Sequence, residues 1–143
     1  MVGKENDTLS TTQLAMVIEK IPVGITVIDL KGHVLYYNEY CSKFVDRKPE
    51  YIGQDIRICH KKPESIVKID RILTDIKEGK TRAFYYETVR SGKKLVVTIS
   101  PYEANGQLIG FIQSFVIKQC YTSYEPATAS AFPVACCGVS ERI

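Results

Sequence analysis

The sequence predicts an α+β domain, because strand-like and helix-like segments follow one another in blocks along one chain of 143 residues. Two β-rich runs come first, several helical pieces follow, and three further β-rich runs close the pattern. Hydrophobic residues make up 45% of the chain and charged residues 24%. This composition is typical of a globular domain that buries a real hydrophobic core.

A helix is predicted from Thr11 to Lys20. Ser10 and Gln13 have the spacing of a capping box, and the helix must end before Pro22. Its apolar residues recur at helical spacing, at Leu14, Val17, Ile18 and Ile21. This stripe needs a partner, which is either the outer face of a sheet or the same helix of a second subunit.

The first strands are predicted at residues 24–30 and 33–38, with a turn at 31–32 between them. Short helical pieces follow at 39–45 and 49–53. The clearest helix covers residues 63–78, because proline suits its first turn and Gly79 suits its end. Its apolar face consists of Ile66, Ile69, Leu73 and Ile76, with Ile72 beside them.

Three strands are predicted after the long helix, at residues 83–89, 95–100 and 108–117. Ser91-Gly92 and Asn105-Gly106 supply the turns between them. The last strand carries apolar residues on both faces, which predicts that both faces are buried. One face would cover the pocket, and the other would need the N-terminal helix or a partner subunit. From about residue 121 the periodicity vanishes, which indicates either a disordered tail or an irregular segment.

Four short segments resemble a PAS domain in their order and spacing. They are residues 21–29 (IPVGITVID), 36–38 (YYN), 52–55 (IGQD) and 105–110 (NGQLIG). Arg57, Cys59 and His60 are similar to residues of bacterial and archaeal PAS modules, including some fused to hemerythrin-like domains. The resemblance implies a five-stranded antiparallel sheet with helices over one face. It also implies a ligand pocket between the sheet and the long helix, and dimers through the N-terminal helix.

On this resemblance, residues 1–20 form a capping or dimerisation helix, 21–118 the PAS domain, and 119–143 a C-terminal tail. Cofactors of the family include haem and flavin. His60 is the candidate ligand of haem iron, although the long helix, where relatives carry this histidine, contains none. The cysteine motif of flavin photosensors is also absent, which makes flavin unlikely. The residues expected to line the pocket are Arg57, Cys59, His60, Ile69, Tyr85, Val97, Ile99 and Gln113.

Several function classes are excluded or disfavoured. The formal charge of +3 and the lack of a long basic run argue against nucleic acid. No apolar run reaches membrane-spanning length, and residues 1–7 lack the apolar core of a secretory signal peptide. We therefore expect a cytoplasmic protein. No C-x-x-C pair occurs among the five cysteines, although Cys136 and Cys137 are adjacent. No catalytic motif is present, so we expect no enzyme.

Two functional hypotheses remain. The first is a sensory module whose pocket accepts a small ligand, with haem at His60 as one candidate. The second is a module with a solid core that acts by homodimerisation, or by docking to a separate kinase or regulator. A redox role for Cys59 would require a lowered thiol pKa, which its basic neighbours make conceivable.

Overall fold

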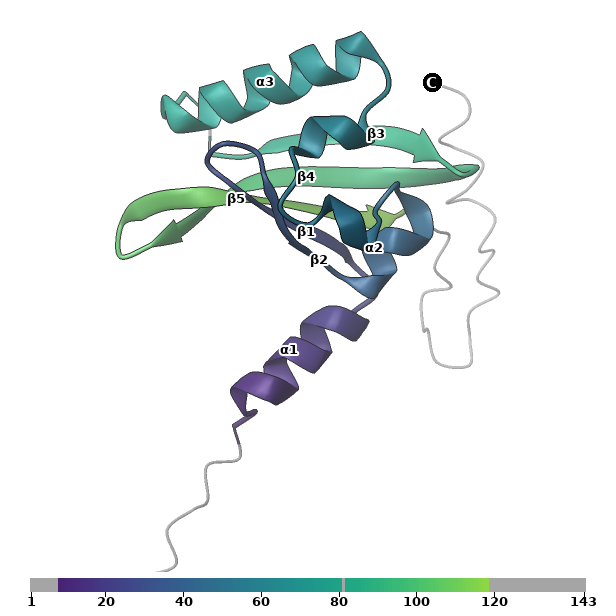
Figure 1. The fold of residues 1–143 in the computed structure, drawn as a ribbon, viewed down its shortest axis with the longest axis vertical. Coiled ribbons are helices and arrows are strands. Elements are labelled where there is room, and N and C mark those ends of the chain that lie inside the picture. Colours follow the sequence, from purple (N-terminus) through teal and green to yellow (C-terminus); the bar gives the residue numbers. More distant parts are fainter. Residues whose placement is uncertain (1–7, 81, 119–143) are drawn as a thin grey trace, which may run out of the picture.

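The computed structural model describes residues 8–80 and 82–118. The predicted C-terminal tail, with Cys136 and Cys137, lies outside these residues. The described part forms one sheet with helices on one of its faces, and the helix α1 extends away from the body (Figure 1). No helix of this part is both long and apolar enough to span a membrane.

Five strands form one antiparallel sheet, in the order β2-β1-β5-β4-β3. The last strand returns to pair with the first, so segments far apart in sequence lie side by side at the centre of the sheet. The α+β fold with five antiparallel strands is thus confirmed. The strands are β1 (Gly24–Asp29), β2 (Val34–Tyr37), β3 (Phe84–Arg90), β4 (Lys93–Ala104) and β5 (Gln107–Ile117).

The helical elements occur where the sequence pattern predicts them, apart from one short 3-10 helix at Ile56–Cys59 that the pattern did not reveal. Asp55 caps this turn by accepting from the Arg57 backbone N–H at 2.9 Å. The helical elements are α1 (Thr11–Lys20), α2 (Glu39–Phe44), η1 (Pro49–Tyr51), η2 (Ile56–Cys59) and α3 (Pro63–Lys77).

The hydrophobic core lies between the helices and the inner face of the sheet. Alternate residues of each strand point inward, as the two-residue repeat of a strand requires. Phe111 on β5 and Leu95 on β4 are fully buried. α3 contributes Ile72, Leu73 and Ile76 to this core, and Ile69 packs against it, which confirms this part of the predicted apolar face of the long helix. Ile66, also predicted on this face, is half-buried and not part of the core.

Asn38 joins three elements at one end of the sheet and is fully buried. Its Oδ1 accepts from the backbone N–H groups of Ile25 and Cys41, at 3.0 Å each. Its Nδ2 donates to the carbonyls of Ile18 at 2.9 Å and Val23 at 2.7 Å. One side chain thereby caps α2, pairs with β1 and holds the end of α1.

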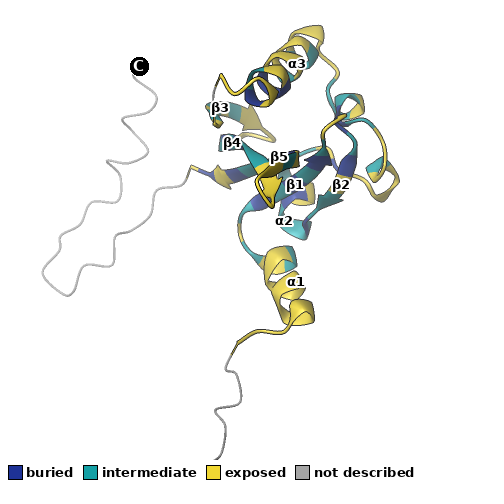
Figure 2. Cartoon of the chain, turned by 90° about the vertical axis from the view of Figure 1, so that its left-hand side faces the viewer, coloured by how far each residue is buried: buried dark blue, intermediate teal, exposed yellow. Residues whose placement is uncertain are grey.

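Helix α1 begins with the predicted capping box between Ser10 and Gln13. None of its residues is buried, and Figure 2 shows the helix projecting from the body with an exposed surface. The side chains of Leu14, Met16 and Val17 are 50%, 63% and 47% exposed. The apolar stripe of α1 therefore has no cover within the described part of the chain.

In the last strand only one face is buried within a single copy of the chain. The predicted cover of its other face by the N-terminal helix is wrong, and cover by a partner subunit stays a prediction. Phe111 and Phe115 point into the core, whereas Val116, on the opposite face of β5, is exposed. No described helix covers this outer face, because α1 projects away from it (Figure 2). Tyr85 and Val89 on β3 are exposed apolar residues of the same outer face.

Candidate ligand-binding site

A cavity of about 590 Å³ lies between the segment that follows α2 and the inner face of β3, β4 and β5. Residues around His60, between η2 and α3, form a further wall. The volume lies within the range of small-molecule sites. The apolar part of the lining consists of Phe44, Val45, Cys59, Leu95, Val97 and Phe115, and the basic part of Lys43, Arg47, Lys48, Lys61, Lys62 and Arg90.

The space directly beneath α3 is much smaller, at about 30 Å³. Its lining includes Ile69, Leu73, Ile99 and Phe111. The layer between the long helix and the sheet is therefore packed nearly solid. The main cavity lies beside this layer, where its lining comes from the segment between α2 and η1, from the residues around His60 and from the strands.

Arg47 is the most unusual residue of the cavity, since only 8% of its surface is exposed. Its Nε donates to Thr26 Oγ1 at 3.1 Å, and one terminal nitrogen donates to Gln113 Oε1 at 2.9 Å. The other terminal nitrogen donates to the backbone carbonyl of Asp46 at 2.8 Å. The guanidinium thus bridges β1 and β5 from a loop, with neutral acceptors only.

Sequence reasoning missed Arg47. The residues between α2 and Pro49 form a polar loop, and a basic residue in such a loop is normally solvated. Val45 and Lys48 are extended, and this backbone conformation carries the Arg47 side chain inward over the sheet. No local pattern distinguishes this arginine from its neighbours, because its burial depends on β1 and β5.

His60 lines both the main cavity and the smaller space under α3. Burial, followed by the positive charges of Arg47 and Arg90, lowers the pKa of His60 from 6.5 to about 4. The imidazole is therefore neutral at pH 7. It can donate or accept a hydrogen bond, but it does not neutralise an anion.

The two described thiols are not activated. Burial raises the pKa of the Cys59 thiol, and the nearby Arg47 guanidinium opposes this only in part. Burial likewise raises the pKa of Cys41, whose sulfur lies 3.2 Å from the Thr26 hydroxyl. The lowered pKa that a redox role of Cys59 would require is thus contradicted, because desolvation outweighs the neighbouring positive charge.

Four of the residues expected in the pocket line the main cavity: Cys59, His60, Val97 and Gln113. Ile69 and Ile99 line only the small space under α3. Tyr85 lines neither, because the strand alternation of β3 points it to the outer face, where it is 67% exposed. Tyr86, its neighbour, points inward instead.

Tyr86 connects β3 to the rest of the site. Burial raises the pKa of its hydroxyl, which lies beside the Gln113 amide. The Lys68 ammonium of α3 lies 3.7 Å from the centre of the Tyr86 ring, in a cation–π contact. A ligand in contact with Tyr86 would therefore also affect the Lys68–Tyr86 contact between α3 and the sheet.

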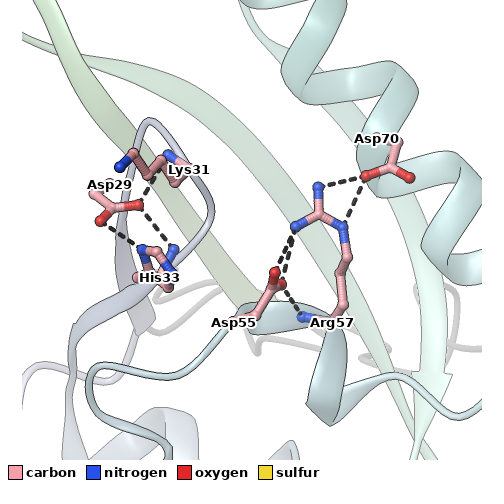
Figure 3. A network of polar contacts seen from close by, with 6 residues as sticks. All are labelled: Asp29, Lys31, His33, Asp55, Arg57 and Asp70. Atoms are coloured by element: carbon pink, nitrogen blue, oxygen red, sulfur yellow. Dashed lines mark hydrogen bonds and ion pairs between the residues drawn. The ribbon is translucent and has the colours of Figure 1, made fainter.

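Arg57 does not line the cavity and instead fastens α3 to η2. Its guanidinium donates to Asp70 of α3, with an Nε–Oδ1 distance of 2.8 Å, and to both oxygens of Asp55 at 2.9 and 3.0 Å (Figure 3). Beside this clamp, Asp29 accepts from the backbone of Lys31 and His33 (Figure 3). The expected pocket role of Arg57 is thus replaced by a structural one, because two carboxylates pair with its positive charge.

The surroundings of His60 do not fit an iron centre well. A neutral imidazole is suitable for ligation. However, the positive charges of Arg47 and Arg90, which disfavour a proton on His60, also disfavour another cation beside it. No group of three metal-binding side chains occurs among residues 8–80 and 82–118. The charges around the cavity favour an anion.

The low pKa of His60 predicts a pH-dependent stability. The unfolded chain binds this proton more strongly than the folded chain does. Stability should therefore be full above about pH 6.5 and should fall as the pH drops towards 4. After allowance for partial exposure, we expect His60 to account for about 1–2 kcal/mol of this loss. Urea unfolding at pH 7 and pH 4 should show a smaller loss for His60→Gln than for the wild type.

His33→Gln is the matched control, because His33 is the second of the two histidines and lies outside the cavity. It should retain the pH dependence that His60→Gln loses. The two imidazole signals in a proton NMR titration check the same point independently. A His60 signal that titrates above pH 6 would contradict the prediction.

The fold and the cavity together define an α+β domain with a cavity on one face of its sheet. The chain belongs to the PAS domain family, whose model matches residues 14–116. No curated protein sequence matches the chain.

Solved structures share this fold. A C-terminal domain from Streptococcus mutans has 20% identity and a TM-score of 0.68, with 78% of this chain and 87% of that chain covered. The PAS domain of Bordetella pertussis BvgS has 18% identity and a TM-score of 0.59, with coverages of 74% and 84%. The Cronobacter turicensis RpfR quorum-sensing receptor PAS domain, in complex with BDSF, has 15% identity and a TM-score of 0.53, with coverages of 72% and 100%.

Proposed function

We propose that the protein is a sensory module that binds a small ligand in the 590 Å³ cavity and passes this event to a protein partner. The observation that carries the proposal is the cavity itself, which combines an apolar wall with convergent polar groups at Arg47, His60, Tyr86 and Gln113. Such a combination is the usual form of a small-molecule site. The proposal assigns the module no catalytic role.

The hydrogen bonds of Arg47 suggest how binding would be transmitted. The guanidinium contacts Thr26 on β1 and Gln113 on β5, the two paired central strands. The start of β1 is joined through Asn38 to the end of α1. A ligand that bound Arg47 and changed its hydrogen bonds to Thr26 and Gln113 would shift the equilibrium between alternative arrangements of β1, β5 and α1.

Two relatives of the same fold support a signalling role. One is a sensory box sensor histidine kinase from Vibrio cholerae, and another is the quorum-sensing receptor PAS domain in complex with BDSF. For this chain, the corresponding partner would be a kinase or another regulator. The family and the cavity together favour sensing over a purely structural role.

The test is a native mass spectrum and a thermal-shift screen of the freshly purified protein. We expect a retained ligand, or a rise in melting temperature with at least one small-molecule class. Thr88→Trp should reduce binding at least tenfold, because Thr88 lines the cavity and the indole would occupy its volume. Glu87→Trp is the matched control, since Glu87 lies on the outer face of the same strand. Equal binding by both variants would refute the cavity as the site.

Haem is the alternative ligand, and an absorbance spectrum tests it separately. Protein purified after haem supplementation would show a Soret band that His60→Ala removes. A spectrum without this band, and no binding of added haem at micromolar concentration, would remove haem from the proposal and leave other ligands.

The second candidate function is homodimerisation through α1, which its exposed apolar stripe favours. The uncovered outer face of the sheet offers apolar residues on which the α1 of another copy could pack. Leu14→Glu should reduce the dimer fraction in sedimentation velocity, because it puts a charge into the stripe. Thr12→Glu, on the other side of the helix, should leave it unchanged. A monomeric wild type would refute this candidate.

A further inference from the structure

The buried guanidinium of Arg47 has no anionic partner. None of the ion pairs among the described residues includes it, and its three hydrogen-bond acceptors are a hydroxyl, an amide oxygen and a backbone carbonyl. Buried charges in proteins are normally paired, because desolvation is costly. Arg57, by contrast, is more exposed and has two carboxylates.

The donors of Arg47 are not used up by these contacts. A guanidinium has five N–H groups, and three donate to the acceptors named above. One N–H on each terminal nitrogen remains. The Arg47 side chain also hydrogen-bonds to the thiols of Cys41 and Cys59, which are weak and uncharged acceptors.

The rest of the cavity does not supply the missing negative charge. Asp46 is the one acidic residue in its lining, against six basic ones. The Asp46 carboxylate accepts from the Tyr51 hydroxyl at 3.2 Å, whereas its backbone carbonyl is the group that faces Arg47. His60 does not compete for the anion-binding role, because it is neutral and carries no charge to pair with an anion. The field inside the cavity is therefore positive.

We propose that the ligand of this cavity is a small organic monocarboxylate, with its carboxylate on the N–H groups of Arg47 that have no oxygen acceptor and its apolar body against Phe44, Leu95 and Phe115. This inference rests on the proposed ligand-binding function and specifies its chemistry. One buried positive charge matches one carboxylate, and a planar fork of N–H donors matches its two oxygens. The aromatic and aliphatic lining residues accept a short hydrocarbon part.

The probes are sodium hexanoate and sodium benzoate, compared at constant ionic strength with hexanamide, benzamide and inorganic phosphate. Isothermal titration calorimetry should show that each carboxylate binds at least tenfold more tightly than its amide. Phosphate should bind more weakly than the carboxylates, because it lacks an apolar body. A bound carboxylate should also raise the NMR-measured pKa of His60, since it neutralises the adjacent Arg47.

Arg47→Gln should weaken carboxylate binding at least tenfold and abolish the preference over the amides. Arg71→Gln is the matched control, because Arg71 is an exposed arginine of α3 outside the cavity lining, and it should leave carboxylate binding unchanged. If Arg47→Gln does not fold, the wild-type comparison of acids with amides and the His60 titration decide the question.

Equal affinity for acids and amides would overturn the inference, as would an unchanged His60 pKa in saturating carboxylate. Preferential binding of phosphate would also overturn it. A neutral molecule found in the cavity by mass spectrometry would leave the sensory function standing and refute only the carboxylate. A chain that binds none of the ligand classes screened would refute both.

Discussion

Asn38→Ala is expected to destabilise the fold by about 3–5 kcal/mol, since it removes a helix cap and leaves several buried groups unpaired. Asn38 is fully buried and makes four hydrogen bonds, to Ile25, Cys41, Ile18 and Val23. Alanine cannot replace either its acceptor or its donors. Urea unfolding monitored by circular dichroism measures the loss.

Two control variants separate the contributions of this side chain. Asn38→Asp keeps an oxygen that can cap α2, but it places a carboxylate oxygen instead of the Nδ2 donor against the carbonyls of Ile18 and Val23, so it should also destabilise strongly. Ser10→Ala removes the exposed cap of α1 and should cost only about 0.5–1 kcal/mol. If Asn38→Ala and Ser10→Ala cost the same, Asn38 does not join the three elements as described.

Phe111→Ala is expected to cost about 3–5 kcal/mol, because a fully buried aromatic ring is replaced by a cavity. The ring borders the small space under α3, together with Ile69 and Leu73. Its removal should enlarge that space into an apolar pocket between the long helix and the sheet. Chemical denaturation gives the energetic cost.

The enlarged pocket provides a second measurement. Benzene should raise the melting temperature of Phe111→Ala and leave that of the wild type unchanged, since dry apolar cavities bind such probes. Ile109→Ala is the matched control on the same strand, and it should cost less than about 1 kcal/mol because Ile109 is 39% exposed. A wild type that responds to benzene would show that the layer under α3 is not packed as the structure has it.

Prediction from sequence was most successful where local patterns decide the outcome. The capping box at Ser10, the proline and glycine at the ends of α3, and the Asn105-Gly106 turn each specify backbone geometry within a few residues. Gly106 and Asn105 both have positive φ, as such a turn requires. These features do not depend on distant parts of the chain.

The candidate site was predicted only in part, for a physical reason. His60 and Gln113 were expected at the pocket because the family resemblance places their segments there, and both line the cavity. Which of Tyr85 and Tyr86 faces the cavity depends on which residues of β3 point inward. Two adjacent tyrosines are equally compatible with either orientation of the strand, so the sequence does not decide between them. The sequence around Arg57 and the sequence around Arg47 do not distinguish the two arginines. Arg57 binds two carboxylates, whereas Arg47 is buried among neutral acceptors.

The amino-acid sequence by itself determined the elements, their order and the PAS domain fold, because capping, turn chemistry and apolar periodicity act over short distances. Only the tertiary structure decided that the cavity lies beside α3 rather than beneath it, and that Arg47 is its buried charge. The physical reason is that desolvation and charge pairing depend on which distant strands meet. Here β1 and β5 meet, and they bring Thr26 and Gln113 to the guanidinium of Arg47.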